Sequence, residues 1–373
     1  MSSELHPGRL AVPAVRELSP YQPGKPISEL ERELGIRDIV KLASNENPYG
    51  PSPRALAAMR AALEDVWLYP DGGAHDLKCG LAAHLGVDPA CLTLGNGSND
   101  LLVLLAEAFL TPAHSAVYSQ YGFALYGLVT RETGAQPFEV PALGMHSSMP
   151  LGHDLAAMAA AITPSTRLVF IANPNNPTGT WATPAALKAL LARAATTTLV
   201  VLDEAYFEYG HALGTQDGVA WQAEHPNLVI LRTFSKAYGL AGARVGYAIS
   251  HPEIADVLNR LRPAFNVNSI AQAGALAALG DQAHMRTAVS ATMRELLRVE
   301  AAFRQLALWS APSAANFLLL RVGMPAAPVF ERLLQRGVIV RPLAGYQLAD
   351  CLRISIGLPQ DNDRLLATLP QVL

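Results

Sequence analysis

The segment TLVVLDEAY, residues 198–206, combines an unbroken apolar run with a carboxylate at its end. Short, continuous runs rich in valine, isoleucine and leucine are typical of strands that are buried on both faces. Two comparable runs lie on either side, TRLVFIANP at 166–174 and NLVILRT at 227–233. A helical pattern, PAALKALLARAA at 184–195, separates the first two. The sequence therefore predicts an α/β fold with a mainly parallel central sheet sandwiched by helices.

The same alternation of short strands and longer helices defines the predicted domains. It extends toward the N-terminus through CLTLG, SAVYS and AQPFEV, whereas the first forty residues are interrupted by prolines and hold one helical stretch, ISELERELG. After Asn268 a long helical region precedes NFLLLRV, GVIVRP and CLRISIG. We expect an N-terminal arm (1–40), a large domain (41–267) and a smaller α+β C-terminal domain (268–373), with the arm packed against the small domain.

Composition excludes several classes of protein. The 373 residues are 50% hydrophobic and 16% charged, with a net charge of −3 and no block of five like charges, so nothing indicates binding to nucleic acid or to a membrane. The cysteines, Cys79, Cys91 and Cys351, form no CxxC pair, which argues against a disulfide framework and a metal site. The most apolar run, LLVLLAEAFL, contains Glu107 and is about half the ~20 residues that span a bilayer. With no signal peptide pattern at the start, we expect a soluble cytoplasmic protein.

Ligands of open α/β sheets bind beyond the carboxyl ends of the strands, and polar residues follow several predicted strands here. GNGSND, 95–100, places a helix start near Ser98, where free N–H groups would bind an anion, although a plain helix cap is the alternative. NPNNPTG, 173–179, offers the donor and acceptor of Asn176 from a stiff turn, which taken alone is as consistent with an ordinary tight turn.

Two charged residues indicate the chemistry more closely. Asp203 ends an apolar strand and should be buried, so it needs a cationic or hydrogen-bonding partner. A ring nitrogen that must stay protonated would be a suitable partner for Asp203, and Tyr206 could bind the same ligand. The alternative is a structural salt bridge or a helix cap. Lys236 lies among apolar and small residues in RTFSKAYGLAGARVGY, 232–247. Apolar surroundings or a nearby cation, for which Arg244 is the candidate, would lower its pKa and leave an amine able to form a Schiff base.

Taken alone, Lys236 is more simply an exposed, solvated lysine. Together, however, an anion site, a buried carboxylate, an asparagine–tyrosine pair and an activated lysine suit pyridoxal 5′-phosphate, an electron sink held by a carboxylate and a Schiff-base lysine. Arg244 and Ser235 would hold its phosphate.

Five motifs together resemble the histidinol-phosphate aminotransferase family, which consists of fold-type-I pyridoxal-phosphate enzymes. They are KLASNENPYGPSP, YPDG, NPNNPTG, DEAY and RTFSKAYGLAGARVGY, and the resemblance covers nearly the whole chain. It implies that Lys236 forms the Schiff base and shuttles the proton, and that Asp203 pairs with the pyridinium nitrogen. The remaining cofactor contacts that it implies are Asn176 and Tyr206 at the 3′ oxygen, Phe123 stacked on the ring, and Ser235, Arg244, Ser98 and Asn99 at the phosphate.

The resemblance also implies a substrate site and a partner subunit. Arg353 would bind the phosphate of histidinol phosphate or the carboxylate of glutamate and 2-oxoglutarate, with Arg341 as its helper and Tyr21 of the arm closing over the substrate. Surface charge is the alternative for both arginines. Tyr69 of YPDG would reach the cofactor phosphate of the neighbouring subunit, which makes the active form a homodimer. The implied reaction, in histidine biosynthesis, converts L-histidinol phosphate and 2-oxoglutarate into imidazole acetol phosphate and L-glutamate.

Three alternatives remain open at the level of sequence. An aromatic-amino-acid or phenylpyruvate aminotransferase would share the scaffold, and no residue pattern separates it cleanly. A decarboxylase of a phosphorylated amino acid is disfavoured by SNENP, 44–48. A ligand-binding regulator would need a DNA-binding domain, and residues 1–40 are too short and proline-rich to form one.

Overall fold

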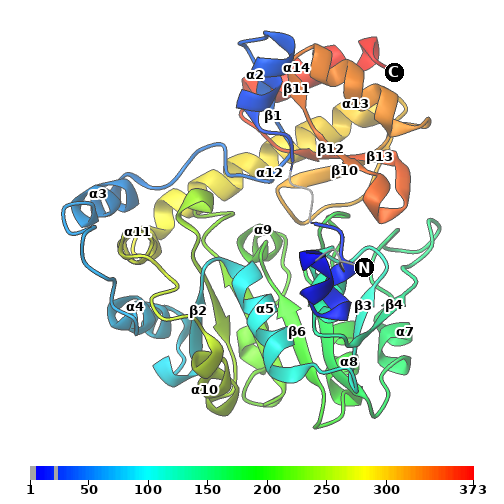
Figure 1. Ribbon diagram of the computed structural model, residues 1–373. Helices are drawn as coiled ribbons and strands as arrows, with labels where there is room; N and C mark the ends of the chain where they lie inside the picture. The colour runs from blue at the N-terminus through cyan, green and yellow to red at the C-terminus, as the bar shows by residue number, and fades with distance from the viewer. Residues whose placement is uncertain (1–5, 21–23) are drawn as a thin grey trace, which may run out of the picture.

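The computed structural model describes residues 6–20 and 24–373. Its largest sheet has seven strands (Figure 1). The strands follow the order β2-β8-β7-β6-β5-β3-β4. Pairing is parallel from β7 to β4, whereas β8 runs antiparallel to both of its neighbours. The strand bounds are β2 Leu92–Gly95, β3 Ser115–Ser119, β4 Gln136–Val140, β5 Thr166–Ala172, β6 Leu199–Asp203, β7 Leu228–Thr233 and β8 Gly246–Ile249. The predicted mainly parallel sheet is therefore confirmed.

Strand β8 was not among the predicted strands. It is only four residues long and follows a run of glycines, so neither its length nor its pattern distinguishes it from a turn. Its position between β2 and β7 explains why it is fully buried despite its short length.

Alternate residues of the central strands pack into two separate cores, one on each face of the sheet. Val201 of β6 belongs to one core, whereas its neighbours Val200 and Leu202 belong to the other. One core includes side chains of α5 (Ser98–Phe109), α6 (Leu125–Glu132) and α10 (Pro252–Leu261). The other includes α4 (His75–Leu85), α7 (Leu155–Ala160), α8 (Pro184–Arg193) and α9 (Phe207–Ala212). Burial on both faces accounts for the continuous apolar runs.

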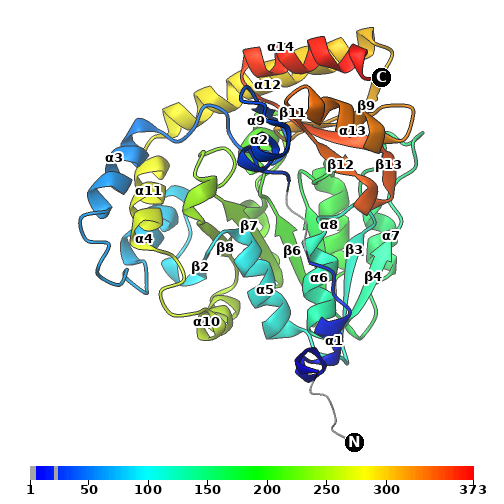
Figure 2. The same ribbon diagram turned by 45° about the horizontal axis from the view of Figure 1, so that its top comes forward.

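The C-terminal part of the chain builds a second, antiparallel sheet (Figure 2). Its order is β12-β13-β10-β9, with bounds Arg341–Leu343, Leu348–Ser355, Phe317–Arg321 and Trp309–Ser310. Helices α13 (Ala326–Gln335) and α14 (Pro359–Thr368) accompany it, and the long α12 (Gln282–Gln305) leads into it from α11 (Ser269–Leu279). An α+β C-terminal unit is thus observed.

The arm makes contact with both parts of the molecule. Helix α1 (Pro13–Arg16) contacts α6, whereas Leu30 of α2 (Ile27–Leu34) shares an apolar cluster with Leu334 and Ile339 of the C-terminal part. Strand β1 (Val40–Lys41) then pairs in parallel with β11 (Val338–Ile339). The chain therefore passes from the C-terminal unit into the large sheet through residues 42–52, which lead to α3 (Pro53–Ala62).

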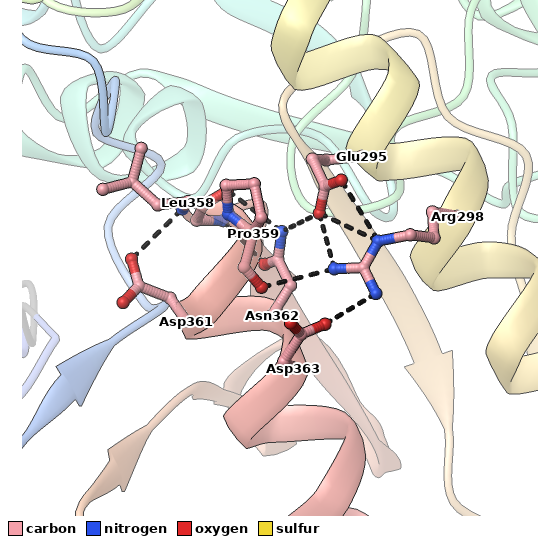
Figure 3. A network of polar contacts seen from close by, with 8 residues as sticks. Glu295, Arg298, Leu358, Pro359, Asp361, Asn362 and Asp363 are labelled. Atoms are coloured by element: carbon pink, nitrogen blue, oxygen red, sulfur yellow. Dashed lines mark hydrogen bonds and ion pairs between the residues drawn. The ribbon is translucent and has the colours of Figure 1, made fainter.

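A polar network fixes the last helix to α12 (Figure 3). Arg298 donates to Glu295 and to Asp363 at 2.7 Å each, and the Asn362 amide donates to Glu295 at 2.9 Å. Since α14 directly follows β13, this network also holds the end of β13 in place. Within residues 6–20 and 24–373, no helix has the length and apolar character to cross a membrane.

Candidate active site

A cavity of about 440 Å³ lies beyond the carboxyl ends of β5, β6 and β7, where the C-terminal unit meets the large sheet. Eleven of the predicted site residues line it: Ser98, Asn99, Phe123, Asn176, Asp203, Tyr206, Ser235, Lys236, Arg244, Arg341 and Arg353. Tyr69 does not line the cavity; it lies on the surface, 82% exposed and stacked on Phe265. Tyr21 falls outside the described residues. The folded chain thus brings together residues from segments that are far apart in the sequence.

Lys236 follows strand β7, and its ammonium group lies within the cavity. Its Nζ atom donates to the Ser44 carbonyl at 3.2 Å. Burial, followed by the positive charge of Arg353, lowers the pKa of Lys236 to about 8; Arg244 has a smaller effect in the same direction. A substantial fraction of the amine is therefore neutral near physiological pH and can attack a carbonyl carbon.

Asp203 ends β6 and is only 5% exposed. The Tyr126 hydroxyl donates to its Oδ2 at 2.8 Å, and the Ala205 amide donates to its Oδ1 at 3.1 Å. Burial raises the pKa of Asp203, although both hydrogen bonds and the charge of Lys236 oppose this effect. A buried carboxylate facing a cavity is stabilised by a cation bound there, such as a protonated ring nitrogen.

Tyr126 had no role in the sequence-based prediction. It is fully buried on α6, stacks on Phe170 with ring centroids 4.9 Å apart, and also contacts Phe123 edge to face. Phe123 lies three residues earlier in the sequence, just before α6 begins at Leu125. That spacing was the available signal, but the contact with Asp203 depends on how α6 packs against the sheet.

The start of α5 forms an anion site with Arg244. The Arg244 guanidinium donates to Ser235 Oγ at 3.2 Å and to the Asn96 carbonyl at 3.4 Å. Gly97 precedes the helix with φ +85°, and a Cβ atom there would lie 2.2 Å from Arg244 Nη2, so only glycine fits. The N–H groups of Ser98 and Asn99, the Ser235 hydroxyl and Arg244 together match the requirements of a phosphate dianion.

A pair of arginines lies on the C-terminal side of the cavity. Arg353 donates from Nη1 to Asn176 Oδ1 and from Nη2 to the Ala43 carbonyl, both at 2.6 Å. Arg341 is its direct partner in the antiparallel pair β12–β13, so the two side chains project from the same face. Only 7% of Arg353 is exposed. Two guanidinium groups that line one cavity favour an anionic substrate.

Asn45 also lines the cavity, and sequence reasoning gave it no role. Its Nδ2 atom donates to the Tyr206 hydroxyl at 2.8 Å, and its backbone N–H donates to Ser355 Oγ at 2.8 Å. It belongs to the SNENP segment, which contributed to the family resemblance only as a motif.

The cavity fits pyridoxal 5′-phosphate in three respects. Its buried carboxylate, Asp203, has a raised pKa and would be stabilised by a protonated pyridine nitrogen. Lys236 has the lowered pKa that attack on the aldehyde requires. Finally, the glycine-lined anion site at α5 and Arg244 would accept the phosphate. No group of three or more histidine, cysteine, aspartate or glutamate side chains suited to a metal ion occurs in the described part of the chain.

Comparisons with known proteins agree with this geometry. Residues 37–369 match the family model described as aminotransferase class I and II. A histidinol-phosphate aminotransferase 2 from Pseudomonas aeruginosa is 52% identical, with 98% of each chain covered, and one from Methylococcus capsulatus is 50% identical at the same coverage. The crystal structure of histidinol-phosphate aminotransferase from Sinorhizobium meliloti, in complex with pyridoxal-5′-phosphate, is 32% identical with a TM-score of 0.88 over 97% of each chain. Together with the cavity, these matches establish that the chain belongs to the aminotransferase class I and II family.

Proposed function

We propose that this protein is a pyridoxal-phosphate-dependent histidinol-phosphate aminotransferase of histidine biosynthesis, which converts L-histidinol phosphate and 2-oxoglutarate into imidazole acetol phosphate and L-glutamate. The observation that carries the substrate assignment is the pairing of Arg341 with Arg353 at the cavity. A phosphate dianion and a carboxylate can both bind to such a pair, as the two half-reactions require. Relatives with this name and about half of the residues in common support the same assignment.

The side chains divide the chemical work according to their surroundings. When bound, the cofactor supplies the electron sink for the electrons of the broken Cα–H bond. Lys236, with its pKa near 8, first holds the cofactor and then carries the α-proton as a neutral amine. Asp203 keeps the ring nitrogen protonated, while Arg353 and Arg341 orient the substrate anion.

The remaining proposed contacts secure the cofactor. Asn176 and Tyr206 hydrogen-bond its 3′ oxygen, and Phe123 packs against its ring. Ser98, Asn99, Ser235 and Arg244 bind its phosphate. Tyr21 closes over the substrate. Each described residue of this set lines the one cavity, which supports the assignment.

We further propose an obligatory homodimer in the cytoplasm. An exposed apolar cluster precedes α4 and lies next to the loop after α10: Val66 is 60%, Trp67 78%, Tyr69 82% and Phe265 43% exposed. Large apolar side chains gathered at a surface favour a protein partner. A second copy of the chain would cover them and would place Tyr69 at the phosphate of the opposite active site. The division into an arm, 1–40, a large domain, 41–267, and a small domain, 268–373, remains part of this proposal.

The test is reconstitution with the cofactor. The purified protein should bind pyridoxal 5′-phosphate with a visible Schiff-base absorbance and should transaminate histidinol phosphate with 2-oxoglutarate. Lys236→Ala should lose both the absorbance and the activity while remaining folded. An unchanged absorbance in Lys236→Ala would disprove the assignment of the lysine.

The alternative, an aromatic-amino-acid or phenylpyruvate aminotransferase, shares the cofactor chemistry. It needs a carboxylate anchor but no site for a substrate phosphate. The paired arginines accommodate a substrate phosphate, and the relatives of 50–52% identity are histidinol-phosphate aminotransferases, so both observations favour histidinol phosphate over this alternative.

A further inference from the structure

Asn45 lies at the junction of the large sheet and the C-terminal unit. It is 1% exposed, and its backbone adopts the left-handed region at φ 56°. Asparagine enters this region more readily than most residues, but the conformation still requires stabilising contacts. The contacts of Asn45 are therefore informative.

All four polar atoms of Asn45 take part in hydrogen bonds. The backbone N–H donates to Ser355 Oγ at 2.8 Å, and the backbone carbonyl accepts from Asn316 at 3.0 Å. Its Oδ1 accepts from the Ser355 hydroxyl at 2.8 Å, and its Nδ2 donates to the Tyr206 hydroxyl at 2.8 Å. Ser355 and Asn316 belong to the C-terminal unit, whereas Tyr206 lies between β6 of the large sheet and α9, so Asn45 joins the two parts.

The direction of each hydrogen bond follows from the one that the Asn45 backbone N–H donates to Ser355. A backbone N–H can only donate, so Ser355 Oγ accepts from Asn45. In the described part of the chain, the acceptor for the buried Ser355 hydroxyl is Asn45 Oδ1. The amide is therefore oriented with Oδ1 toward Ser355 and Nδ2 toward Tyr206. The Tyr206 oxygen accepts from Asn45, and its own hydrogen points to a different acceptor.

We propose that Asn45 is a positioning residue: anchored by Ser355, it directs the hydroxyl hydrogen of Tyr206 toward the 3′ oxygen of the cofactor. The inference rests on the proposed function, since it needs the cofactor in this cavity. Ser355 is two residues beyond Arg353 on β13, so both side chains lie on the same face of that strand. The strand that binds the substrate anion thereby also sets the hydrogen bonding of the cofactor ring.

A hydrogen bond donated by Tyr206 stabilises negative charge on the 3′ oxygen. With the cofactor bound as proposed, that oxygen would lie next to the nitrogen that Lys236 contributes to the Schiff base and would share its proton. Stabilising the charge on the oxygen would therefore lower the proton affinity of the pair. Losing the donated bond therefore raises the pH midpoint at which the visible absorbance of the holoprotein changes. A net hydrogen bond corresponds to roughly a 3- to 10-fold change in proton affinity.

The experiment compares this midpoint, and the dissociation constant for pyridoxal 5′-phosphate, in single and double variants. Ser355→Ala removes the hydrogen bonds that anchor Asn45 without adding charge. It should raise the pH midpoint by an amount that corresponds to about a 3-fold or larger increase in proton affinity. Asn45→Asp cannot donate to Tyr206 when ionised and should raise it further. Tyr206→Phe should raise the midpoint by itself, and Ser355→Ala should add nothing in that background. Asn45→Gly tolerates the positive φ, so it shows whether the local backbone conformation is retained without the asparagine side chain.

Ser313→Ala provides the matched control. Ser313 is a buried serine of the C-terminal unit whose hydroxyl donates to the Phe317 carbonyl, outside this chain of hydrogen bonds. The Ser313→Ala variant should have the same pH midpoint as the wild-type protein. Ser355→Ala without any shift, or with an equal shift in the wild-type and Tyr206→Phe backgrounds, would overturn the inference. Failure of the proposed function has a different signature, since the wild-type protein itself would then show no Schiff-base absorbance with the cofactor.

Discussion

Arg341 and Arg353 are direct partners across the antiparallel strands β12 and β13, and both line the cavity that contains Lys236. Arg353 is also held in place by Asn176 and by the carbonyl of Ala43. A fixed guanidinium that already makes two hydrogen bonds has little freedom to reorient, so it provides a rigid anchor for an anion.

The first prediction concerns these arginines. Arg353→Lys keeps the charge but loses the planar fork, and we expect kcat/KM for histidinol phosphate to fall by roughly 10- to 100-fold, the range for a charged hydrogen bond. Arg341→Gln should lower kcat/KM for histidinol phosphate, which carries a phosphate, more than kcat/KM for glutamate. Steady-state kinetics with both substrates measures this, and equal losses for the two substrates in Arg341→Gln would indicate a structural role.

The second prediction concerns the pH dependence of Lys236 reactivity in the apoprotein. Its pKa is lowered to about 8, so the neutral, reactive amine is populated above that pH and lost below it. Labelling by an amine-directed reagent, followed by peptide mass spectrometry, should show the midpoint near pH 8, with the exposed Lys188 as a reference for the reagent. Because Arg353 is the larger charged cause, Arg353→Gln should move the midpoint to higher pH by more than Arg244→Gln does. The reverse order would contradict this account of the electrostatics.

The third prediction concerns Tyr126. Its hydrogen bond favours the ionised form of Asp203, so Tyr126→Phe should raise the pKa of that carboxyl. The carboxylate is then lost at higher pH than in the wild type, and cofactor affinity should fall by roughly 3- to 10-fold, with the larger loss at the lower pH. Fluorescence titration with pyridoxal 5′-phosphate gives the affinities. As a control, Tyr118→Phe deletes a buried hydroxyl that interacts with Arg131 rather than with Asp203. This variant should leave the cofactor affinities unchanged.

The fourth prediction concerns the surface around Trp67. Trp67→Lys places a charge in the proposed interface and should produce a monomer without activity, as measured by sedimentation equilibrium and by transamination. Leu297→Lys alters another exposed apolar residue, 58% exposed on α12, and should leave the assembly intact. Mixing Lys236→Ala subunits with Tyr69→Ala subunits should restore part of the activity, because each pair contains one intact composite site. A fully active monomer would remove Tyr69 from the active site.

Residues in short motifs at strand ends could be predicted from the sequence. Asp203 and Lys236 each follow an apolar run, and the carboxyl ends of parallel strands meet at one edge of the sheet. Tyr126 and Asn45 could not be predicted in this way. Their contacts join residues 77 and 161 positions apart, and these depend on helix packing and on the arrangement of the two sheets. Strand β8 was missed for a local reason, since Gly246–Ile249 directly continues a glycine-rich run that resembles a turn.

We propose that this cavity serves a phosphate-bearing amine rather than an aromatic amino acid. The most direct measurement is kcat/KM for histidinol phosphate, phenylalanine and tyrosine, each with 2-oxoglutarate as amino acceptor. The paired arginines predict that histidinol phosphate is preferred by a wide margin over both aromatic amino acids. A wide preference for phenylalanine or tyrosine would contradict the assignment and would identify the chain as an aromatic aminotransferase on the same scaffold.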